Sequence, residues 1–146
     1  MTSDIAKKPK KDVPMKTFKF TNYENIQLEP KHKVIVMRML KNRKILVFGT
    51  RYGELALWFK HKTYKPMKKW QGHKSLVTQI IELDNGRLAT YGVDRKIKIW
   101  SPLLKLLQTL QTSDNGVICI LGLSNNKLVT GDSLGVMVFW NIQSGK

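Results

Sequence analysis

The side chains best suited to chemistry in this sequence are three histidines, one cysteine and a few scattered carboxylates. His73 and Asp94 are of the types that serve as general base and acid in enzymes. His32 and His61 stand apart from them, and no group of residues has the spacing of a metal site. The sequence also lacks a glycine-rich phosphate loop, a nucleophile elbow and a paired carboxylate set. We therefore predict no enzymatic activity, no cofactor and no bound metal.

Cys119 is the only cysteine, so the chain cannot hold an internal disulfide. It lies in an apolar run, residues 117–121, where we expect a small buried thiol with a structural role. Such cysteine usage is typical of a reducing compartment. No stretch approaches the about 18 consecutive apolar residues that span a bilayer, and the N-terminus lacks the apolar core of a secretory signal. We expect an intracellular protein, in the cytoplasm or the nucleus, with no membrane partner.

Positive charge is concentrated in the first half of the chain. The 146 residues are 42% hydrophobic and carry a net charge of +16. Residues 1–74 hold 19 Lys and Arg against 5 Asp and Glu, whereas residues 75–146 hold 7 against 5. A basic surface attracts acidic proteins and nucleic-acid phosphates, although lysine also serves simply to keep exposed loops soluble.

A flexible basic arm is predicted for residues 1–16, which contain five Lys and two Pro and little apolar periodicity. Four of these lysines form a compact patch: Lys7, Lys8, Lys10 and Lys11. The patch is either a nuclear-localisation or phosphate-binding signal, or a plain solvated tail. Residues 17–30 are expected to form one short strand and a loop that ends at Pro30.

From residue 31 onward, short apolar runs alternate with polar turns, as in a protein built of β-strands. No segment holds a helical apolar period over about ten residues. Asp84-Asn85-Gly86 is a strong hairpin signal, because Asn and Gly tolerate positive φ. The leucine-rich stretch Pro102–Leu110 could also suit a helix, but Pro102 and the surrounding pattern favour a strand.

Three tryptophans mark an internal repeat. Trp58, Trp100 and Trp140 lie 42 and 40 residues apart and close the blocks GTRYGELALW, YGVDRKIKIW and GDSLGVMVFW. Each block has apolar residues one and three positions before its tryptophan, and a glycine eight or nine positions before it. Such a match, three times over, indicates a repeat architecture in which each unit is one small sheet.

This pattern resembles the WD40 family of β-propellers over residues 31–146. The middle block resembles the family most closely, because it opens with Gly72-His73 and ends with Trp100, like the family's Gly-His and Trp-Asp marks. The closing mark differs in all three blocks, where the residues after the tryptophans are Phe59, Ser101 and Asn141.

The resemblance implies an all-β fold of about three WD40-type propeller blades, each with four antiparallel strands. The blades are expected at about residues 31–71, 72–111 and 112–146, with outer strands at 66–71 and 103–111 and none for the third blade. Propellers close with about four to eight blades, so this chain cannot close a ring alone. A missing segment, another chain or self-association would complete the ring, or the blades stand as an open arc.

The resemblance also implies a buried tetrad in the middle blade, made of His73, Thr90, Asp94 and Trp100. An imidazole, a hydroxyl, a carboxylate and an indole N–H can satisfy one another in series, which favours a structural role over catalysis. The first block has Phe48 and Tyr52 at the Thr90 and Asp94 positions, and the third has Leu134 at the latter. Only the middle blade is therefore expected to hold a full tetrad.

The predicted function is a non-enzymatic scaffold for protein–protein interaction within a larger complex, because propeller rims present rigid loops. Candidate contacts on one rim are Arg51, Tyr52, Arg95 and Lys96. The run Lys60–Lys69 adds Tyr64, Lys68 and Lys69, unless it is only a solvated outer strand with its loop. The alternative function is a nuclear RNA- or chromatin-associated propeller, for instance in ribosome assembly, that uses the basic first half of the chain.

Overall fold

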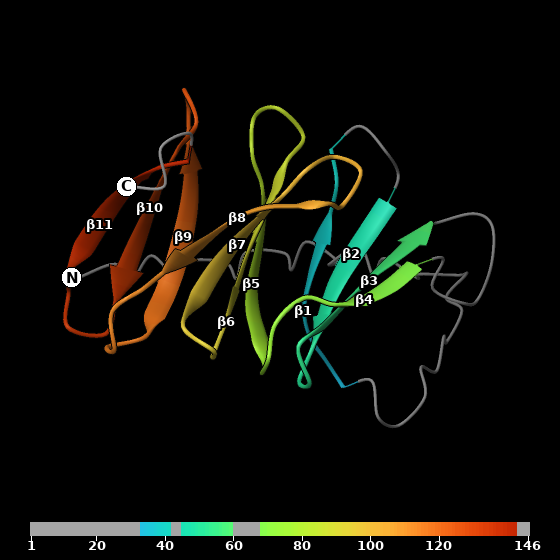
Figure 1. Cartoon of the computed structure of the whole chain (residues 1–146), viewed down its shortest axis with the longest axis horizontal. Coiled ribbons are helices and arrows are strands. Elements are labelled where there is room, and N and C mark those ends of the chain that lie inside the picture. The colour runs from blue at the N-terminus through green and yellow to red at the C-terminus, as the bar shows by residue number, and fades with distance from the viewer. Residues whose placement is uncertain (1–32, 42–44, 60–67, 143–146) are drawn as a thin grey trace, which may run out of the picture.

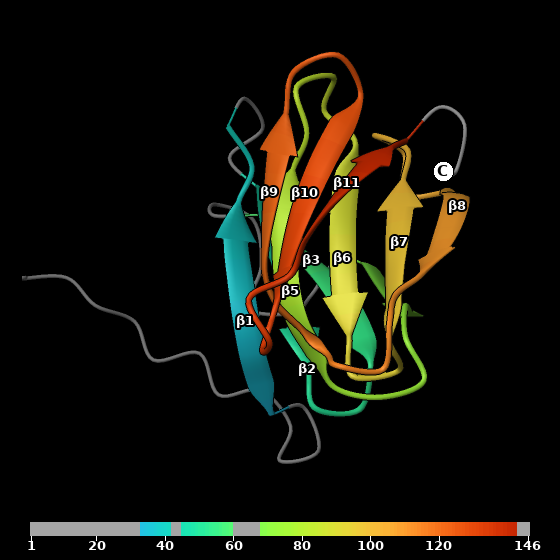
Figure 2. The same cartoon turned by 90° about the vertical axis from the view of Figure 1, so that its left-hand side faces the viewer.

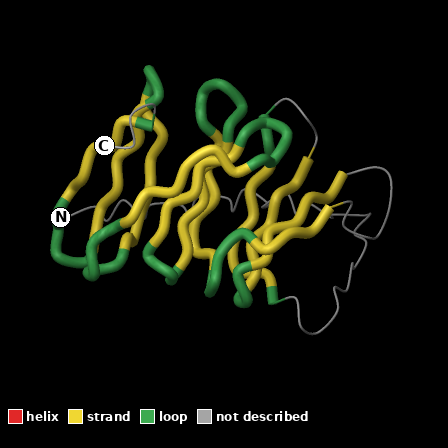
Figure 3. The backbone as a smooth tube through the Cα atoms, viewed as in Figure 1, coloured by secondary structure: helices red, strands yellow, loops and turns green. Residues whose placement is uncertain are grey.

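The computed structural model describes residues 33–41, 45–59 and 68–142, and these contain strands and loops but no helix (Figure 3). The predicted all-β class is confirmed, and this part of the chain offers no helix that could cross a bilayer. In chain order the strands are β1 (Val34–Met39), β2 (Ile45–Thr50), β3 (Glu54–Phe59), β4 (Lys68–Gln71), β5 (Val77–Glu82), β6 (Leu88–Gly92), β7 (Lys96–Trp100), β8 (Leu106–Gln111), β9 (Val117–Leu123), β10 (Lys127–Asp132) and β11 (Met137–Asn141).

The strands form three antiparallel sheets in which neighbours in sequence are neighbours in space (Figure 1). Their orders are β1-β2-β3-β4, β5-β6-β7-β8 and β9-β10-β11. Turn residues explain this meander: Gly86 has a φ of +73° between β5 and β6, and Asn125 and Asn126 have φ of +59° and +58° between β9 and β10. Glycine and asparagine adopt such backbone at low cost, and the hairpin predicted at residues 84–86 is confirmed.

The three sheets stack with their faces together, and their first strands lie on one side of the stack. Strand β5 contacts both β1 and β9, and Figure 2 places β8 on the opposite side from these three strands. Side-chain alternation directs Leu88 toward Leu55 of the first sheet, while Ile97 and Ile99 face Leu128 of the third. Each such fully buried side chain stabilises the fold by roughly 1.5–3 kcal/mol. The hydrophobic core therefore lies between the stacked sheets.

The sheets form an open arc, and none of the other described strands covers the outer face of the third sheet. Leu121, Met137 and Phe139 on this face are 62%, 69% and 65% exposed. Cys119 lies on the same face, two residues from Leu121, and is exposed, so the expectation of a buried thiol is wrong. Strand β9, which carries Cys119 and Leu121, has apolar side chains on both faces, and the sequence alone does not show that only one face is covered.

The outer strand of the second sheet begins later than predicted. Residues 101–105 form a turn in which the Leu104 N–H donates to the Ser101 carbonyl and the Ser101 N–H to the Lys105 carbonyl, each at 2.8 Å. The leucine-rich stretch is therefore a turn followed by β8, which starts at residue 106. The predicted arm at residues 1–16 and the strand and loop at 17–30 lie outside the described residues.

Candidate functional site

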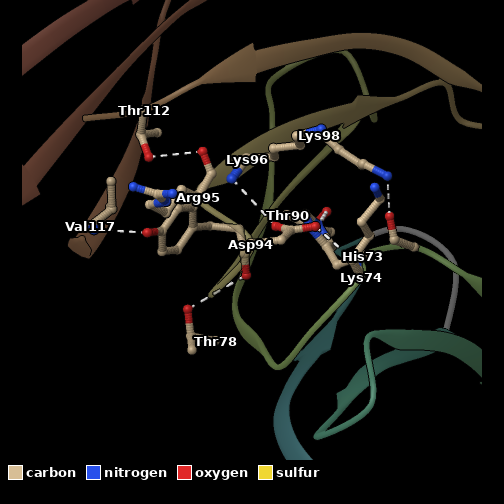
Figure 4. Close-up of polar contacts among 12 residues, drawn as sticks. His73, Lys74, Thr78, Thr90, Asp94, Arg95, Lys96, Lys98, Thr112 and Val117 are labelled. Atoms are coloured by element: carbon tan, nitrogen blue, oxygen red, sulfur yellow. Dashed lines mark hydrogen bonds and ion pairs between the residues drawn. The ribbon is translucent and has the colours of Figure 1, made fainter. Parts of the chain in front are cut away.

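A hydrogen-bonded series of four side chains lies on the face of the second sheet that packs against the first (Figure 4). Thr90 comes from β6, Trp100 from β7, His73 from the loop before β5, and Asp94 from the turn between β6 and β7. His73 Nδ1 lies 2.9 Å from Asp94 Oδ1. Thr90 Oγ1 lies 2.7 Å from His73 Nε2 and 2.9 Å from Trp100 Nε1. The structure thus brings together the four residues that the family resemblance singled out.

The direction of each hydrogen bond follows from the chemistry of the groups. An indole N–H only donates and a carboxylate only accepts, so Trp100 donates to Thr90, and His73 donates from Nδ1 to Asp94. The Thr90 hydroxyl then donates to the unprotonated Nε2 of a neutral imidazole. Burial, helped by the nearby charges of Lys98 and Lys96, lowers the pKa of His73 by more than the Asp94 carboxylate raises it, which favours this neutral form at neutral pH.

Asp94 ties the network to the backbone of two loops. Its Oδ2 accepts from the Lys74 N–H at 2.9 Å and its Oδ1 from the Lys96 N–H at 3.3 Å. Partial burial raises the pKa of Asp94, but these backbone donors and His73 outweigh that effect and hold the pKa below its ordinary value. The carboxylate stays ionised and fastens the loop before β5 to the turn between β6 and β7.

The network leaves no room for a substrate. His73 and Thr90 are 1% and 0% exposed, and both ring nitrogens of His73 are already hydrogen-bonded. Gly92 borders the ring, where a Cβ atom would lie 2.8 Å from His73 Cγ. A general base must reach the proton that it removes, so this geometry suits the fastening of strands rather than catalysis. Across the residues that the structure describes, no group of three or more His, Cys, Asp or Glu could hold a metal ion.

The position eight residues before each repeat tryptophan distinguishes the middle sheet from its neighbours. It is Gly92 in the second sheet, Thr50 in the first and Asp132 in the third. Thr50 Oγ1 accepts from the N–H four residues further along at 3.1 Å. Asp132 Oδ1 accepts from the N–H groups two and four residues further along, at 3.0 and 2.9 Å. The flanking sheets therefore cap this turn with the side chain at that position, whereas the middle sheet has a glycine there, next to the His73 ring.

The third sheet keeps part of the polar network. Trp140 Nε1 donates to Thr130 Oγ1 at 3.0 Å, which repeats the contact between Trp100 and Thr90. Sequence reasoning missed the role of Asp132, although a carboxylate at the start of a turn is a recognised Asx-turn signal.

The turns between the second and third strands of the sheets lie at one end of the molecule, along the lower edge of Figure 1. This end, called the turn rim below, carries Arg51 and Tyr52 between β2 and β3, and Arg95 and Lys96 at the turn between β6 and β7. Arg51, Tyr52 and Arg95 are exposed, whereas Lys96 is half-buried. The first four predicted contact residues thus share one rim.

Two glutamines that sequence reasoning missed hold the turn rim in place. Gln71, at the end of β4, donates from Nε2 to the carbonyls of Tyr52 at 2.8 Å and His73 at 2.6 Å. Gln111, at the end of β8, donates in the same way to the carbonyls of Arg95 at 3.2 Å and Thr112 at 3.4 Å. Glutamine as the last residue of two successive outer strands is the repeat signal that would have identified them.

Lys68 and Lys69 do not belong to the turn rim. Lys68 and Lys69 are exposed on β4, where Lys68 Nζ lies 5.9 Å from the centroid of the Trp70 ring. Tyr64 lies outside the described residues, as does the whole lysine patch of Lys7, Lys8, Lys10 and Lys11.

No protein-family model matches this chain, and no curated protein matches its sequence. Solved structures match its fold. A chain of the mitotic checkpoint complex is 25% identical, with a TM-score of 0.64 over 73% of this chain and 35% of that chain. The computationally designed proteins Ika4 and Ika8 are each 24% identical with a TM-score of 0.62. The matches cover 75% of this chain and 66% of Ika4, and 79% of this chain and 35% of Ika8, so this chain spans less than two thirds of each matched structure. Together with the sheet topology, these likenesses show an all-β fold of antiparallel propeller-type blades that does not close a ring.

Proposed function

We propose that this chain is part of a WD40-type propeller that acts as a non-enzymatic scaffold for protein–protein interaction. The turn rim is the observation that carries the proposal, because it presents Arg51, Tyr52 and Arg95 to solvent on turns fixed by glutamine side chains. Arginine and tyrosine are among the residues that contribute most to binding at protein interfaces. Rigid turns lower the entropy that ordering would cost on binding.

Assignment to the WD40 family is supported by the tryptophan repeat and by the geometry of the buried tetrad. The likeness to a chain of a multi-protein complex agrees with a role in assembly. A non-enzymatic role is supported by the use of His73 and Asp94 within the network, where each holds the other in place.

Completion of the ring is part of the same proposal. The bare face of the third sheet presents Leu121, Met137 and Phe139, and large apolar patches of this kind are sites of interaction. Further blades, from this protein or from another chain, would cover that face. Replacing Phe139 by Asp should reduce self-association of the chain in sedimentation velocity. An unchanged sedimentation profile would argue against this apolar face as a site of association.

The scaffold function can be tested by photo-crosslinking from the turn rim. A photoreactive phenylalanine analogue is placed at position 52 of the protein in the organism that produces it. On illumination it should crosslink the chain to a defined set of proteins. The same analogue at Asp84, which is exposed in the turn between β5 and β6 at the other end of the sheets, serves as the control. Equal capture from both positions, or no protein capture from the turn rim, would count against the scaffold.

The nucleic-acid alternative rests on the net charge of +16 and its concentration in residues 1–74. RNA binding through such charge would fall steeply with salt and would weaken when residues 1–16 are removed. A filter-binding assay across a salt series measures both effects. No RNA retention near physiological salt would remove this alternative.

A further inference from the structure

Arg95 occupies a position that is glycine in the other two sheets. Five residues before the repeat tryptophan stand Gly53, Arg95 and Gly135, with φ of +83°, +62° and +81°. An arginine is strained in this left-handed region, because its Cβ crowds the following carbonyl oxygen. In the middle sheet, therefore, Arg95 stands at a turn position whose backbone conformation favours glycine.

The surrounding hydrogen bonds hold this strained turn in place. The Arg95 carbonyl accepts three hydrogen bonds: from the Thr112 N–H at 3.0 Å, from the Thr112 hydroxyl at 2.9 Å and from Gln111 Nε2 at 3.2 Å. The Arg95 N–H donates to the Gly92 carbonyl at 3.0 Å. Figure 4 shows Arg95 beside Thr112 and Val117, away from the buried histidine. Strained residues persist where their surroundings over-determine them, and they concentrate at binding sites.

An open groove of about 620 Å³ lies next to this turn, between the second and third sheets, and Arg95 lines it. Its apolar part includes Val93 and Ile118, which are 53% and 61% exposed. Tyr91 also lines the groove, and its hydroxyl accepts a hydrogen bond from the Val117 N–H at 3.0 Å, which ties the second sheet to the third at this point. The groove thus combines an apolar surface with a guanidinium.

The Arg95 guanidinium forms a weak ion pair that a ligand carboxylate can replace. It pairs with Asp114, and the two side chains are 50% and 88% exposed. An ion pair so open to water contributes little stability, so a ligand carboxylate can take the place of Asp114 at small loss. The other nearby carboxylate, Asp94, is directed into the buried network and bonded to His73 and the Lys74 N–H.

We propose that this groove binds an extended peptide segment of a partner protein that carries an acidic side chain beside an apolar one. The carboxylate pairs with Arg95, and the apolar side chain packs against Val93 and Ile118. This inference rests on the proposed scaffold function and specifies the chemistry of the partner at the turn rim.

The probe is a set of three fluorescein-labelled octapeptides in which Leu alternates with Glu, Gln or Lys. Fluorescence anisotropy with the whole chain should show the Glu peptide binding roughly tenfold more tightly than the Gln peptide, since a hydrogen bond to a charged group outweighs one to a neutral group. The Lys peptide should bind most weakly. Equal binding of the Glu and Gln peptides, or no binding of either, would overturn the proposal.

Two variants of the ion pair should shift binding in opposite directions. Arg95→Gly removes the guanidinium and relieves the backbone strain, so the chain stays folded while the preference for Glu is lost. Asp114→Asn removes the competing carboxylate, so the Glu peptide should bind several-fold more tightly. Arg51→Ala, on the same rim but outside the groove, is the control for general charge and should leave the Glu preference unchanged.

The outcomes separate this inference from the scaffold function itself. If Arg95→Gly keeps the full preference for Glu, or if Arg51→Ala removes as much of it, the groove is not the acidic-peptide site. Protein capture by the photo-crosslinker at position 52 would then still support a scaffold. If crosslinking captures no protein while the Glu preference depends on Arg95, the groove binds peptides and the scaffold function fails.

Discussion

Replacing Thr90 by Val isolates the contribution of the buried network to stability. The Thr90 hydroxyl is hydrogen-bonded to both Trp100 and His73, at 2.9 and 2.7 Å. Valine has nearly the same shape, so the change removes the hydroxyl and adds no void. Any loss of stability then reports the polar network rather than the packing of the core.

The expected loss follows from the two groups that would lose their partners. Trp100 and His73 are 4% and 1% exposed, so neither the indole N–H nor the imidazole Nε2 can turn to water. A buried polar group left without a partner costs about 1–3 kcal/mol. For the two groups together, Thr90→Val should lower the free energy of unfolding by roughly 2–6 kcal/mol, a large share of the about 5–15 kcal/mol that stabilises a typical domain.

Thr130→Val in the third sheet is the matched control. Thr130 accepts the same contact from Trp140 at 3.0 Å, but Trp140 is only half-buried and the sheet has no histidine partner for the hydroxyl. The freed indole N–H can reach water, so the loss should be about 0.5–1.5 kcal/mol.

Urea unfolding followed by far-UV circular dichroism measures both variants without relying on tryptophan emission, which the substitutions themselves alter. The midpoint should fall more for Thr90→Val than for Thr130→Val, with an unchanged dependence on denaturant. Equal losses in the two sheets would refute the reasoning, as would a loss below about 1 kcal/mol for Thr90→Val.

Three further predictions concern pH and the glycines around the network. Burial lowers the pKa of His73, so below its ordinary value of about 6.5 the unfolded chain binds more protons than the folded one, and stability should fall as pH drops from 7 toward 5. The lowered pKa of Asp94 adds a second loss below about pH 4. In urea unfolding, His73→Gln should flatten the profile between about pH 7 and 5 and should leave part of the loss below about pH 4, because the backbone N–H groups of Lys74 and Lys96 still lower the pKa of Asp94. A variant whose stability falls as steeply between about pH 7 and 5 as that of the wild type would contradict this. Gly53→Ala should be far more destabilising in thermal unfolding than Gly135→Ala, because its Cβ would lie 2.0 Å from the His73 carbonyl oxygen while nothing lies within 4 Å of the other; comparable losses would speak against the close approach. Gly92→Ala should cost less in a His73→Ala background than alone, since its Cβ competes with the ring for space, and additive free energies of unfolding would show that the two do not compete.

Local signals in the sequence predicted the strands and several turns. The Asp84-Asn85-Gly86 turn and the apolar alternation near each repeat tryptophan depend on residues close together in the chain, and the structure follows them. The grouping of His73 with Asp94 is different, because 21 residues separate them and nothing local links the two. Their proximity was predicted only through the resemblance of the repeat to a known family.

Features that depend on neighbouring sheets or on single backbone angles were not predictable in this way. Cys119 is exposed because no described sheet covers its face, whereas its apolar run reads the same in either case. Leu104 and Arg95 have φ of +63° and +62°, which their residue types do not suggest. At Arg95 only alignment with Gly53 and Gly135 reveals the left-handed turn, and only the hydrogen bonds to its carbonyl show how the turn is held.

The residue eight positions before the tryptophan differs between the sheet that holds the tetrad and its neighbours. Thr50 and Asp132 cap their turns through backbone N–H groups two to four residues away. In the middle sheet Gly92 has no side chain to form such a cap, and the His73 ring lies against it instead. Through this ring the loop before β5 is hydrogen-bonded to Thr90 of β6 and to Asp94 in the turn between β6 and β7. A local cap fixes one turn, whereas the tetrad fixes the loop before β5 relative to the turn that carries Arg95. Glycine at position 92 therefore allows the tetrad to hold the turn that carries Arg95. The other two sheets have glycine, Gly53 and Gly135, at the Arg95 position, so only the middle sheet combines a tetrad with a side chain in this turn.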